Sequence, residues 1–265
     1  MATFVSASDI SEGWVRAVEE LLAAGGRLHN LVVSIDNPLQ EDLSVRSEVE
    51  ALMVSAAVGS ARVNSVETVA NTIFPRSLYQ GAGTAQRLFD LYELSLPVLR
   101  TCPKNKQGLY FERMVRWPEP DREGKYRNQL EIAISSLRNE MSRAAHNSRH
   151  ALEIGTSLPG DFVIQDVRVE DPARDARKQY GFPCLSHISL TLENRTLHMA
   201  AFYRSHFFVE RAYGNYLGLG RLLGFLCEES GAQLGELVCV SSGAQVECAK
   251  TKVRECLRGI REGES

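Results

Sequence analysis

The chain has 265 residues, of which 44% are hydrophobic and 24% are charged, and its net charge is −3. This composition is typical of a globular protein with a substantial core, and the slight negative charge argues against a dedicated nucleic-acid binder. The cysteines form no CxxC pair and the histidines form no HExxH or HxH cluster, so we expect neither a disulfide framework nor a metal site. We also expect no signal peptide, no membrane span and a cytoplasmic location.

The N-terminal half reads mainly as helices, with one predicted strand at residues 30–36. The spacing of apolar residues predicts helices at residues 10–26, 44–59, 63–75, 84–100 and 128–141. Gly25 and Gly26 are expected to end the first helix and Pro75 the third. Pro97 is expected to end or kink the fourth, because proline has no N–H to donate within a helix.

Residues 102–126 are rich in Pro, Gly, Lys and Arg, yet they contain four aromatic side chains, those of Tyr110, Phe111, Trp117 and Tyr126. The composition predicts a long loop. A long loop inside a compact domain is often functional, so we treat this segment as a candidate part of a site.

The C-terminal half contains most of the predicted sheet. Residues 187–203 alternate apolar and polar side chains around Asn194-Arg195, which predicts a hairpin. The other predicted elements are strands or extended turns at residues 148–156 and 161–171, a buried strand at residues 235–243, and helices at residues 207–230 and 246–262. The first of these helices is so apolar that it must be buried nearly all round. We therefore predict a single α+β domain covering residues 1–265.

A cysteine, an arginine and an asparagine are spaced in a distinctive way around this hairpin. Cys184, preceded by proline, comes before it, Arg204-Ser205 follows twenty residues later, and Asn215 lies near the start of the apolar helix. The stretches GLYFERMVRWP and NSRHALEI precede them, and GELVCVSSGAQVE follows. This order resembles the thymidylate synthase and pyrimidine nucleotide hydroxymethylase superfamily over roughly residues 108–247. The resemblance implies a thymidylate-synthase-like fold, with a large mixed sheet flanked by helices.

The resemblance also implies covalent catalysis on a pyrimidine ring. Cys184 would add to C6 and make C5 a carbon nucleophile, which attacks a one-carbon electrophile. Tyr110 would assist removal of the C5 proton, and Glu67, on an earlier helix, is the candidate for the family's catalytic glutamate. Arg204 would serve both the thiol and the substrate phosphate, and Ser205 would donate a hydrogen bond to that phosphate.

Binding roles follow from the same resemblance. Asn215 would read the pyrimidine carbonyl and ring N–H, and its amide favours a uracil-like over a cytosine-like edge. Arg149 and His150 would match paired arginines that reach the phosphate from the other subunit, so we expect a homodimer with shared sites. Methylenetetrahydrofolate is the expected co-substrate, with Trp117 and Phe207 as candidate contacts. The acceptor is expected to be a nucleotide-like small molecule.

Several positions depart from the family's pattern. Leu185 follows the cysteine where the family has histidine, and Phe207 stands where an aspartate contacts the pteridine. Gln245 and Glu247 replace a His-x-Tyr element that holds the sugar hydroxyl. The family's N-terminal arginine loop is not recognisable, and a short basic helix stands in place of its C-terminal tail. Because these differences concern the sugar and the folate, we expect methylation or hydroxymethylation of an unusual acceptor rather than thymidylate synthesis.

Plainer readings of the same residues stay open. Taken alone, Cys184 fits a buried small hydrophobe, Arg204 a surface ion pair and Tyr110 loop packing. The protein would then be a nucleotide-binding homodimer without chemistry. A further alternative is folate-independent thiol chemistry at C5, such as dehalogenation or decarboxylation. A paired thiol and phenol favours an enzyme, and a reactive, low-pKa Cys184 is the expectation that separates these readings.

Overall fold

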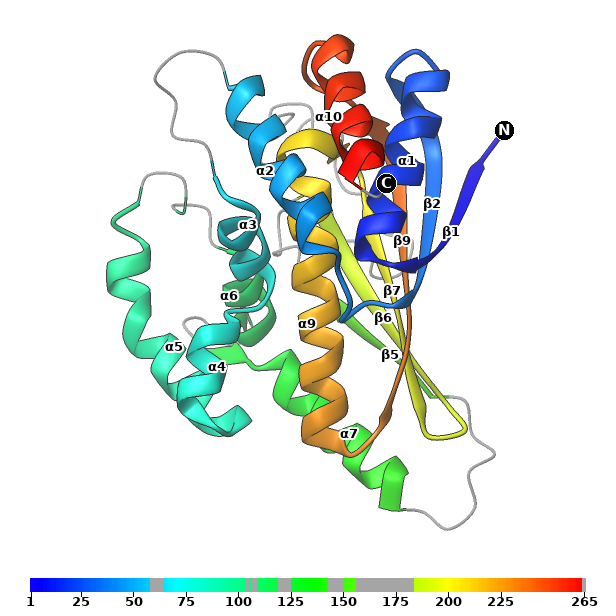
Figure 1. The fold of residues 1–265 in the computed structure, drawn as a ribbon. Coiled ribbons are helices and arrows are strands. Elements are labelled where there is room, and N and C mark those ends of the chain that lie inside the picture. The colour runs from blue at the N-terminus through cyan, green and yellow to red at the C-terminus, as the bar shows by residue number, and fades with distance from the viewer. Residues whose placement is uncertain are drawn as a thin grey trace, which may run out of the picture.

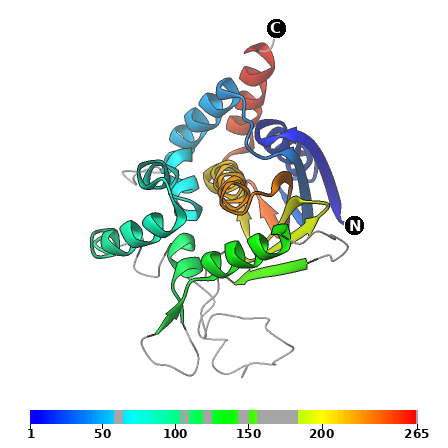
Figure 2. The ribbon, with the colours of Figure 1, turned by 90° about the horizontal axis from the view of Figure 1, so that it is seen from below.

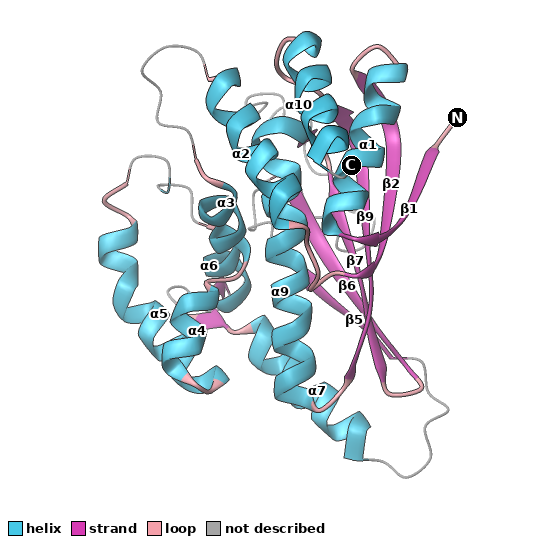
Figure 3. Ribbon diagram, in the orientation of Figure 1, coloured by secondary structure: helices cyan, strands magenta, loops and turns pink. Residues whose placement is uncertain are grey.

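The structure is a computed structural model that describes residues 1–57, 64–102, 105, 109–118, 125–142, 150–155 and 184–263, with the backbone alone for residues 150–155. The described strands form a twisted sheet, and the described helices pack on one of its faces (Figure 1, Figure 3). None of these helices is both long and apolar enough to cross a membrane.

Seven described strands form one mixed sheet, in the order β1-β2-β9-β7-β6-β5 with β8 beside β9. They are β1 (Thr3–Asp9), β2 (Arg27–Asn37), β5 (His150–Gly155), β6 (Leu185–Glu193), β7 (Thr196–Tyr203), β8 (His206–Phe207) and β9 (Gln233–Gln245). β1 is parallel to β2, β9 is antiparallel to β2 and parallel to β7, and β5, β6 and β7 are antiparallel neighbours. The expected large mixed sheet is therefore present, and β1 and β2 extend it into the N-terminal part of the chain.

The predicted hairpin is confirmed as β6 and β7. Its central residues, Asn194 and Arg195, have φ angles of 49° and 68°, and this left-handed backbone matches the twist of strands joined by a two-residue turn. The backbone N–H of Arg204 donates to the carbonyl oxygen of Cys184 at 2.9 Å, so the two ends of the hairpin are held together. The strand predicted at residues 161–171 lies outside the described residues.

Helices cover the inner face of the sheet. They are α1 (Ile10–Ala23), α2 (Leu43–Ala56), α3 (Val66–Ile73), α4 (Arg76–Ala82), α5 (Ala85–Leu99), α6 (Tyr110–Val115), α7 (Gln129–Ser142), the π-helical turn η2 (Phe208–Ala212), α9 (Tyr213–Ser230) and α10 (Lys250–Gly263). Two short strands, β3 (Trp117–Pro118) and β4 (Tyr126–Arg127), form a separate antiparallel pair. Every helix predicted from the sequence is present.

Two expectations about the first half of the chain were wrong in part. Residues 102–126 are not one continuous loop, because α6 and the β3–β4 pair form within them and α6 buries Phe111 and Met114 completely. Pro97 does not end α5, which continues to Leu99. A proline in the last turn removes a single helical hydrogen bond, which the end of a helix tolerates. The short elements β1 and α4 were not predicted.

α9 is the central helix, enclosed by the sheet, α7 and α3 when the molecule is viewed from below (Figure 2). Nearly all of its residues are buried, as predicted. Two glycines allow α3 to approach it closely. A Cβ on Gly214 would lie 2.6 Å from the Cβ of Val69, and one on Gly218 would lie 2.7 Å from the carbonyl oxygen of Ala70. The two helices are therefore in direct backbone contact, and larger side chains at these glycines would push α3 away.

Candidate functional site

Cys184 and Tyr110, the predicted nucleophile and the predicted acid/base, lie in contact. Cys184 immediately precedes β6, and Tyr110 is the first residue of α6. The phenol oxygen of Tyr110 accepts hydrogen bonds from the backbone N–H groups of Cys184, at 3.2 Å, and Leu185, at 3.4 Å. A residue that lies 74 positions earlier in the chain is thereby fixed beside the predicted nucleophile.

Two arginines act electrostatically on the thiol. Burial raises the pKa of Cys184 above the ordinary value of a thiol, and the charges of Arg204 and Arg211 oppose that shift. Burial also raises the pKa of Tyr110, and the neighbouring Cys184 adds to that shift. The expectation of a low-pKa thiol was therefore wrong for the protein without substrate, because desolvation outweighs the two cations.

Arg211 was missed by the sequence analysis. It belongs to η2, a π-helical turn that leads directly into α9, and such turns are frequent at functional sites. The carboxylate of Glu247, which follows β9, accepts hydrogen bonds from the backbone N–H groups of Val209 and Glu210 in the same turn. Glu247 therefore stabilises η2. No local sequence pattern distinguished Arg211 from an ordinary surface arginine.

The predicted phosphate-binding residues are only partly described. Arg204 and Ser205 are exposed between β7 and β8, where a phosphate can reach them. His150 begins β5 opposite Leu192, but its side chain lies outside the described part of the chain, as does the whole of Arg149. Phosphate binding by these residues therefore stays a prediction.

Asn215 is joined to a buried imidazole. Its Nδ2 lies 3.0 Å from Nε2 of His206, and Nδ1 of His206 lies 2.9 Å from Oγ of Ser241. Burial lowers the pKa of His206 to about 3, so the ring is neutral at physiological pH. A neutral imidazole has one donor and one acceptor nitrogen. With the amide N–H of Asn215 donating to Nε2, Nδ1–H donates to Ser241, and the amide keeps its carbonyl oxygen and second N–H for a substrate.

Tyr203 packs against the buried imidazole of His206. Its ring stacks on that of His206, with 4.1 Å between centroids and 5° between planes, and it pairs with Leu185 across the hairpin. Tyr216 packs edge-on against the same imidazole. Both phenol hydroxyls are buried and have no hydrogen-bond partner within the described chain, so each can be satisfied by a substrate or a water. Tyr203 therefore lies between the imidazole that is bonded to Asn215 and Leu185, the residue that follows Cys184.

Glu67 has a different environment from the one predicted. Its carboxylate accepts two hydrogen bonds from Arg221, at 2.7 and 2.9 Å, and one from Arg46 at 3.2 Å. These bonds, above all those from Arg221, lower the pKa of Glu67, so the carboxylate is ionised at neutral pH. Among the described residues Glu67 forms no hydrogen bond with Cys184 or Tyr110, and the structure does not bring it into their cluster.

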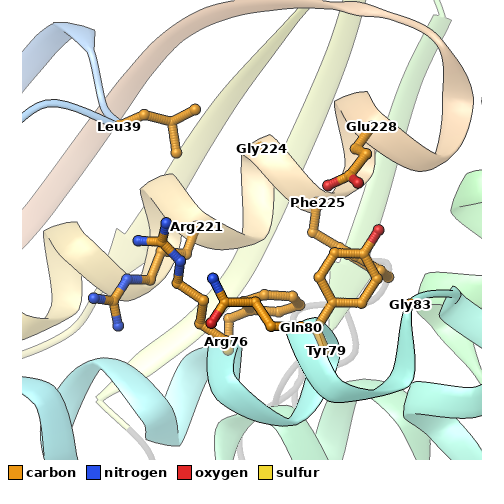
Figure 4. A pocket seen from close by; sticks show the side chains of 10 residues that line it. Leu39, Arg76, Tyr79, Gln80, Gly83, Arg221, Gly224, Phe225 and Glu228 are labelled. Atoms are coloured by element: carbon orange, nitrogen blue, oxygen red, sulfur yellow. The ribbon is translucent and has the colours of Figure 1, made fainter.

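Arg221 also faces a pocket of about 400 Å³ between α4 and α9 (Figure 4). The aromatic rings of Phe74, Tyr79 and Phe225 form much of its wall, and Arg76 extends into it from α4. Because Arg221 already has a carboxylate partner, its charge is compensated within the protein. This pocket therefore offers little buried positive charge to an anionic substrate.

The two candidate folate contacts lie in separate elements. Trp117 pairs with Arg127 in the β3–β4 ribbon, whereas Phe207 pairs with Gln245 between β8 and β9. Both aromatic residues are half-buried, so each offers part of a ring face to a ligand. Neither side chain supplies a carboxylate to such a ligand.

No protein-family model matches the chain, and no curated protein matches it. The resemblance in residue order therefore stays a hypothesis about family. A function has to be proposed from the chemistry of the cluster around Cys184.

Proposed function

We propose that this protein is a transferase that uses Cys184 to move a one-carbon group to C5 of a pyrimidine nucleotide or a related electron-rich ring. The observation that carries the proposal is the contact of Tyr110 with the backbone of Cys184, with Arg204 and Arg211 acting on the same thiol. A structural cysteine requires neither a phenol nor cations beside it. The proposal includes a thymidylate-synthase-like fold in one domain and a cytoplasmic location, which the six free thiols favour.

Cys184 begins the proposed reaction by losing its proton to solvent and adding to C6. The C6–S bond forms as the C5=C6 π bond breaks, and the electron pair passes to C5 and the adjacent carbonyl. Arg204 and Arg211 stabilise the thiolate against the effect of burial. C5 then attacks a one-carbon electrophile at the oxidation level of formaldehyde.

Tyr110 assists the next step, in which C5 loses its proton. Because its pKa is raised, Tyr110 acts as a neutral phenol that passes the proton between C5 and water. As C5 loses this proton, the bond between the transferred carbon and the donor's nitrogen breaks, and the donor leaves as an amine that takes up a proton. The ring then carries an exocyclic methylene, which takes up water to give a hydroxymethyl group or hydride to give a methyl group. The thiolate of Cys184 leaves C6 and the C5=C6 bond is restored. Methylenetetrahydrofolate is the proposed donor of the carbon, and of the hydride in methylation.

Phe207 favours a second candidate, thiol chemistry at C5 without folate. An apolar ring in place of the family's pteridine-binding aspartate weakens the case for a folate donor. Decarboxylation begins in the same way. After Cys184 adds to C6, C5 takes up a proton, carbon dioxide then leaves C5, and the electron pair that it releases restores the C5=C6 bond as the thiolate is expelled from C6. The non-enzymatic alternative is a homodimer that binds a nucleotide without reacting with it. The hydrogen bond between the backbone N–H of Cys184 and the hydroxyl of Tyr110 argues against this alternative.

A homodimer is part of the proposal, and the outer face of the sheet supports it. Phe4, Val32, Val240 and Phe202 lie in one register row across β1, β2, β9 and β7, on the face opposite the helices. Phe4 is 68% exposed, and the other three side chains are half-buried. A contiguous apolar row on an open sheet face is typical of a contact between subunits.

Exchange of the C5 proton tests the addition of the thiol directly, because a C6 adduct makes that proton exchangeable. The protein is incubated in heavy water with UMP, dUMP, CMP and dCMP, with and without methylenetetrahydrofolate, and the C5 proton is followed by NMR. We expect one nucleotide to lose its C5 signal. Cys184→Ala should abolish the exchange, whereas Cys102→Ala, which removes an exposed thiol, should leave it unchanged.

The outcomes separate the candidates. A methylated or hydroxymethylated product in the presence of the donor supports one-carbon transfer. Exchange without a new product favours the folate-independent reaction. Binding of a nucleotide, measured by calorimetry, without any exchange would favour a binding module. If neither binding nor exchange is observed, these nucleotides are excluded as acceptors.

A further inference from the structure

A second cavity, of about 410 Å³, lies between α3 and α5. Its walls include Thr68, Asn71 and Thr72 from α3, and Tyr92 and Ser95 from α5. None of its described lining residues is charged. It therefore differs from the pocket of Figure 4, whose lining contains arginine and glutamate side chains.

Two of the lining side chains have hydrogen-bonding capacity that no described residue fills. The hydroxyls of Thr72 and Ser95 each donate to a backbone carbonyl of their own helix at 2.7 Å. In contrast, Oδ1 of Asn71 is buried without a hydrogen-bond partner in the described part of the chain. The hydroxyl of Tyr92, which is only 2% exposed, accepts from the backbone N–H of Glu112 but has no acceptor for its own proton among the described residues. Folded proteins contain few such groups, so two in one cavity wall point to a missing partner.

We infer that this cavity binds an uncharged molecule with both a hydrogen-bond donor and an acceptor, such as an aromatic amide or lactam. Tyr92 donates to the carbonyl oxygen of the ligand, and Oδ1 of Asn71 accepts from its N–H. A charged ligand would lose its hydration without meeting a counter-charge in the described walls. Pro75, Leu78 and Leu99 supply apolar surface for the remainder of the ligand, and the volume suits a small ring compound.

The cavity adjoins the segment that carries the proposed catalytic tyrosine. Leu109 lines the cavity and directly precedes Tyr110, whose hydroxyl contacts Cys184. A ligand in the cavity therefore contacts the start of α6. Binding in this cavity depends on the cavity and its unsatisfied groups alone, so it is tested independently of the proposed function.

Nicotinamide and nicotinate form a matched pair of probes, because they share one ring and differ in charge. Each is titrated into the full chain, and binding is followed by calorimetry and by NMR. We expect saturable binding of nicotinamide and binding of nicotinate that is weaker by about tenfold or more. Tyr92→Phe and Asn71→Leu should each weaken nicotinamide binding by about tenfold, since each removes one hydrogen bond to the ligand.

Tyr79→Phe is the control variant. It removes the hydroxyl of a tyrosine that bonds to Glu229 at 3.0 Å and does not line this cavity, so nicotinamide binding should not change. Circular dichroism and thermal unfolding establish that the variants are folded. Equal binding of the two probes, absence of saturable nicotinamide binding, or undiminished binding in both cavity variants would each overturn the inference.

Discussion

We expect the buried imidazole of His206 to make the protein easier to unfold in acid. Burial lowers the pKa of His206 to about 3 in the folded protein, whereas a histidine in an unfolded chain titrates near 6.5. Below pH 6.5 the imidazole of His206 binds a proton in the unfolded chain but not in the folded protein. The stability associated with the neutral ring is therefore fully present above pH 6.5 and is lost progressively as the pH falls toward 3.

The size of the effect follows from the distance between pH and pKa. At pH 5 the unfolded chain lies about 1.5 pH units below its histidine pKa, which favours unfolding by about 2 kcal/mol. At pH 7.5 the same contribution is close to zero. His206→Gln removes the titrating group and keeps a donor and an acceptor for Asn215 and Ser241. Between pH 7.5 and 5, the wild type should therefore lose about 2 kcal/mol more unfolding free energy than this variant.

Urea unfolding at the two pH values, followed by the fluorescence of Trp14 and Trp117, measures this difference. The other titrating groups are common to both proteins, so their contributions largely cancel in the comparison. Equal losses of stability in the two proteins would refute the reasoning, because His206 would then take up a proton while folded. Nitrogen-15 NMR of the imidazole at pH 5 gives an independent reading, and we expect a neutral ring bonded between Asn215 and Ser241.

Two further changes test the electrostatics of the thiol and the packing of α9. Arg211→Gln should slow the alkylation of Cys184 by iodoacetamide at pH 8, because the loss of this cation raises the thiol pKa further; an unchanged rate, measured by peptide mass spectrometry, would contradict its role. Gly218→Ala should lower the free energy of unfolding by about 1–3 kcal/mol, since its Cβ would lie 2.7 Å from the carbonyl oxygen of Ala70. Gly81→Ala, which has open space around it, should instead stabilise α4 by about 0.5–1 kcal/mol, and equal effects of the two in urea unfolding would argue against the close contact of α3 with α9.

Local chemistry was sufficient to predict the β6–β7 hairpin and the burial of α9. Alternating apolar residues around Asn194-Arg195 suit a two-residue turn, and a helix without a polar face cannot lie on the surface. The order of residues also placed Cys184 and Arg204 at the two ends of that hairpin. The hydrogen bond between their backbones confirms that they are neighbours.

Short elements were harder to predict, because their stability depends on distant contacts. α6 has only six residues, too few for a helical period to stand out in a segment rich in proline and glycine. Its Phe111 and Met114 are buried by the packing of other helices, and this burial stabilises a helix that would not form alone. α5 continues past Pro97 for a local reason, because a proline in the last turn removes only one helical hydrogen bond.

The sequence by itself determined the types and order of most elements and the neighbourhood of Cys184, whereas the tertiary structure decided the partners of each candidate residue. One N–H of the Asn215 amide is bonded to His206, and the carboxylate of Glu67 is bonded to Arg221, 154 residues away. The raised pKa of Cys184 likewise depends on burial that no local pattern encodes. Hydrogen bonds and desolvation are set by atoms a few ångströms apart in space, and the residues that supply those atoms are scattered along the chain.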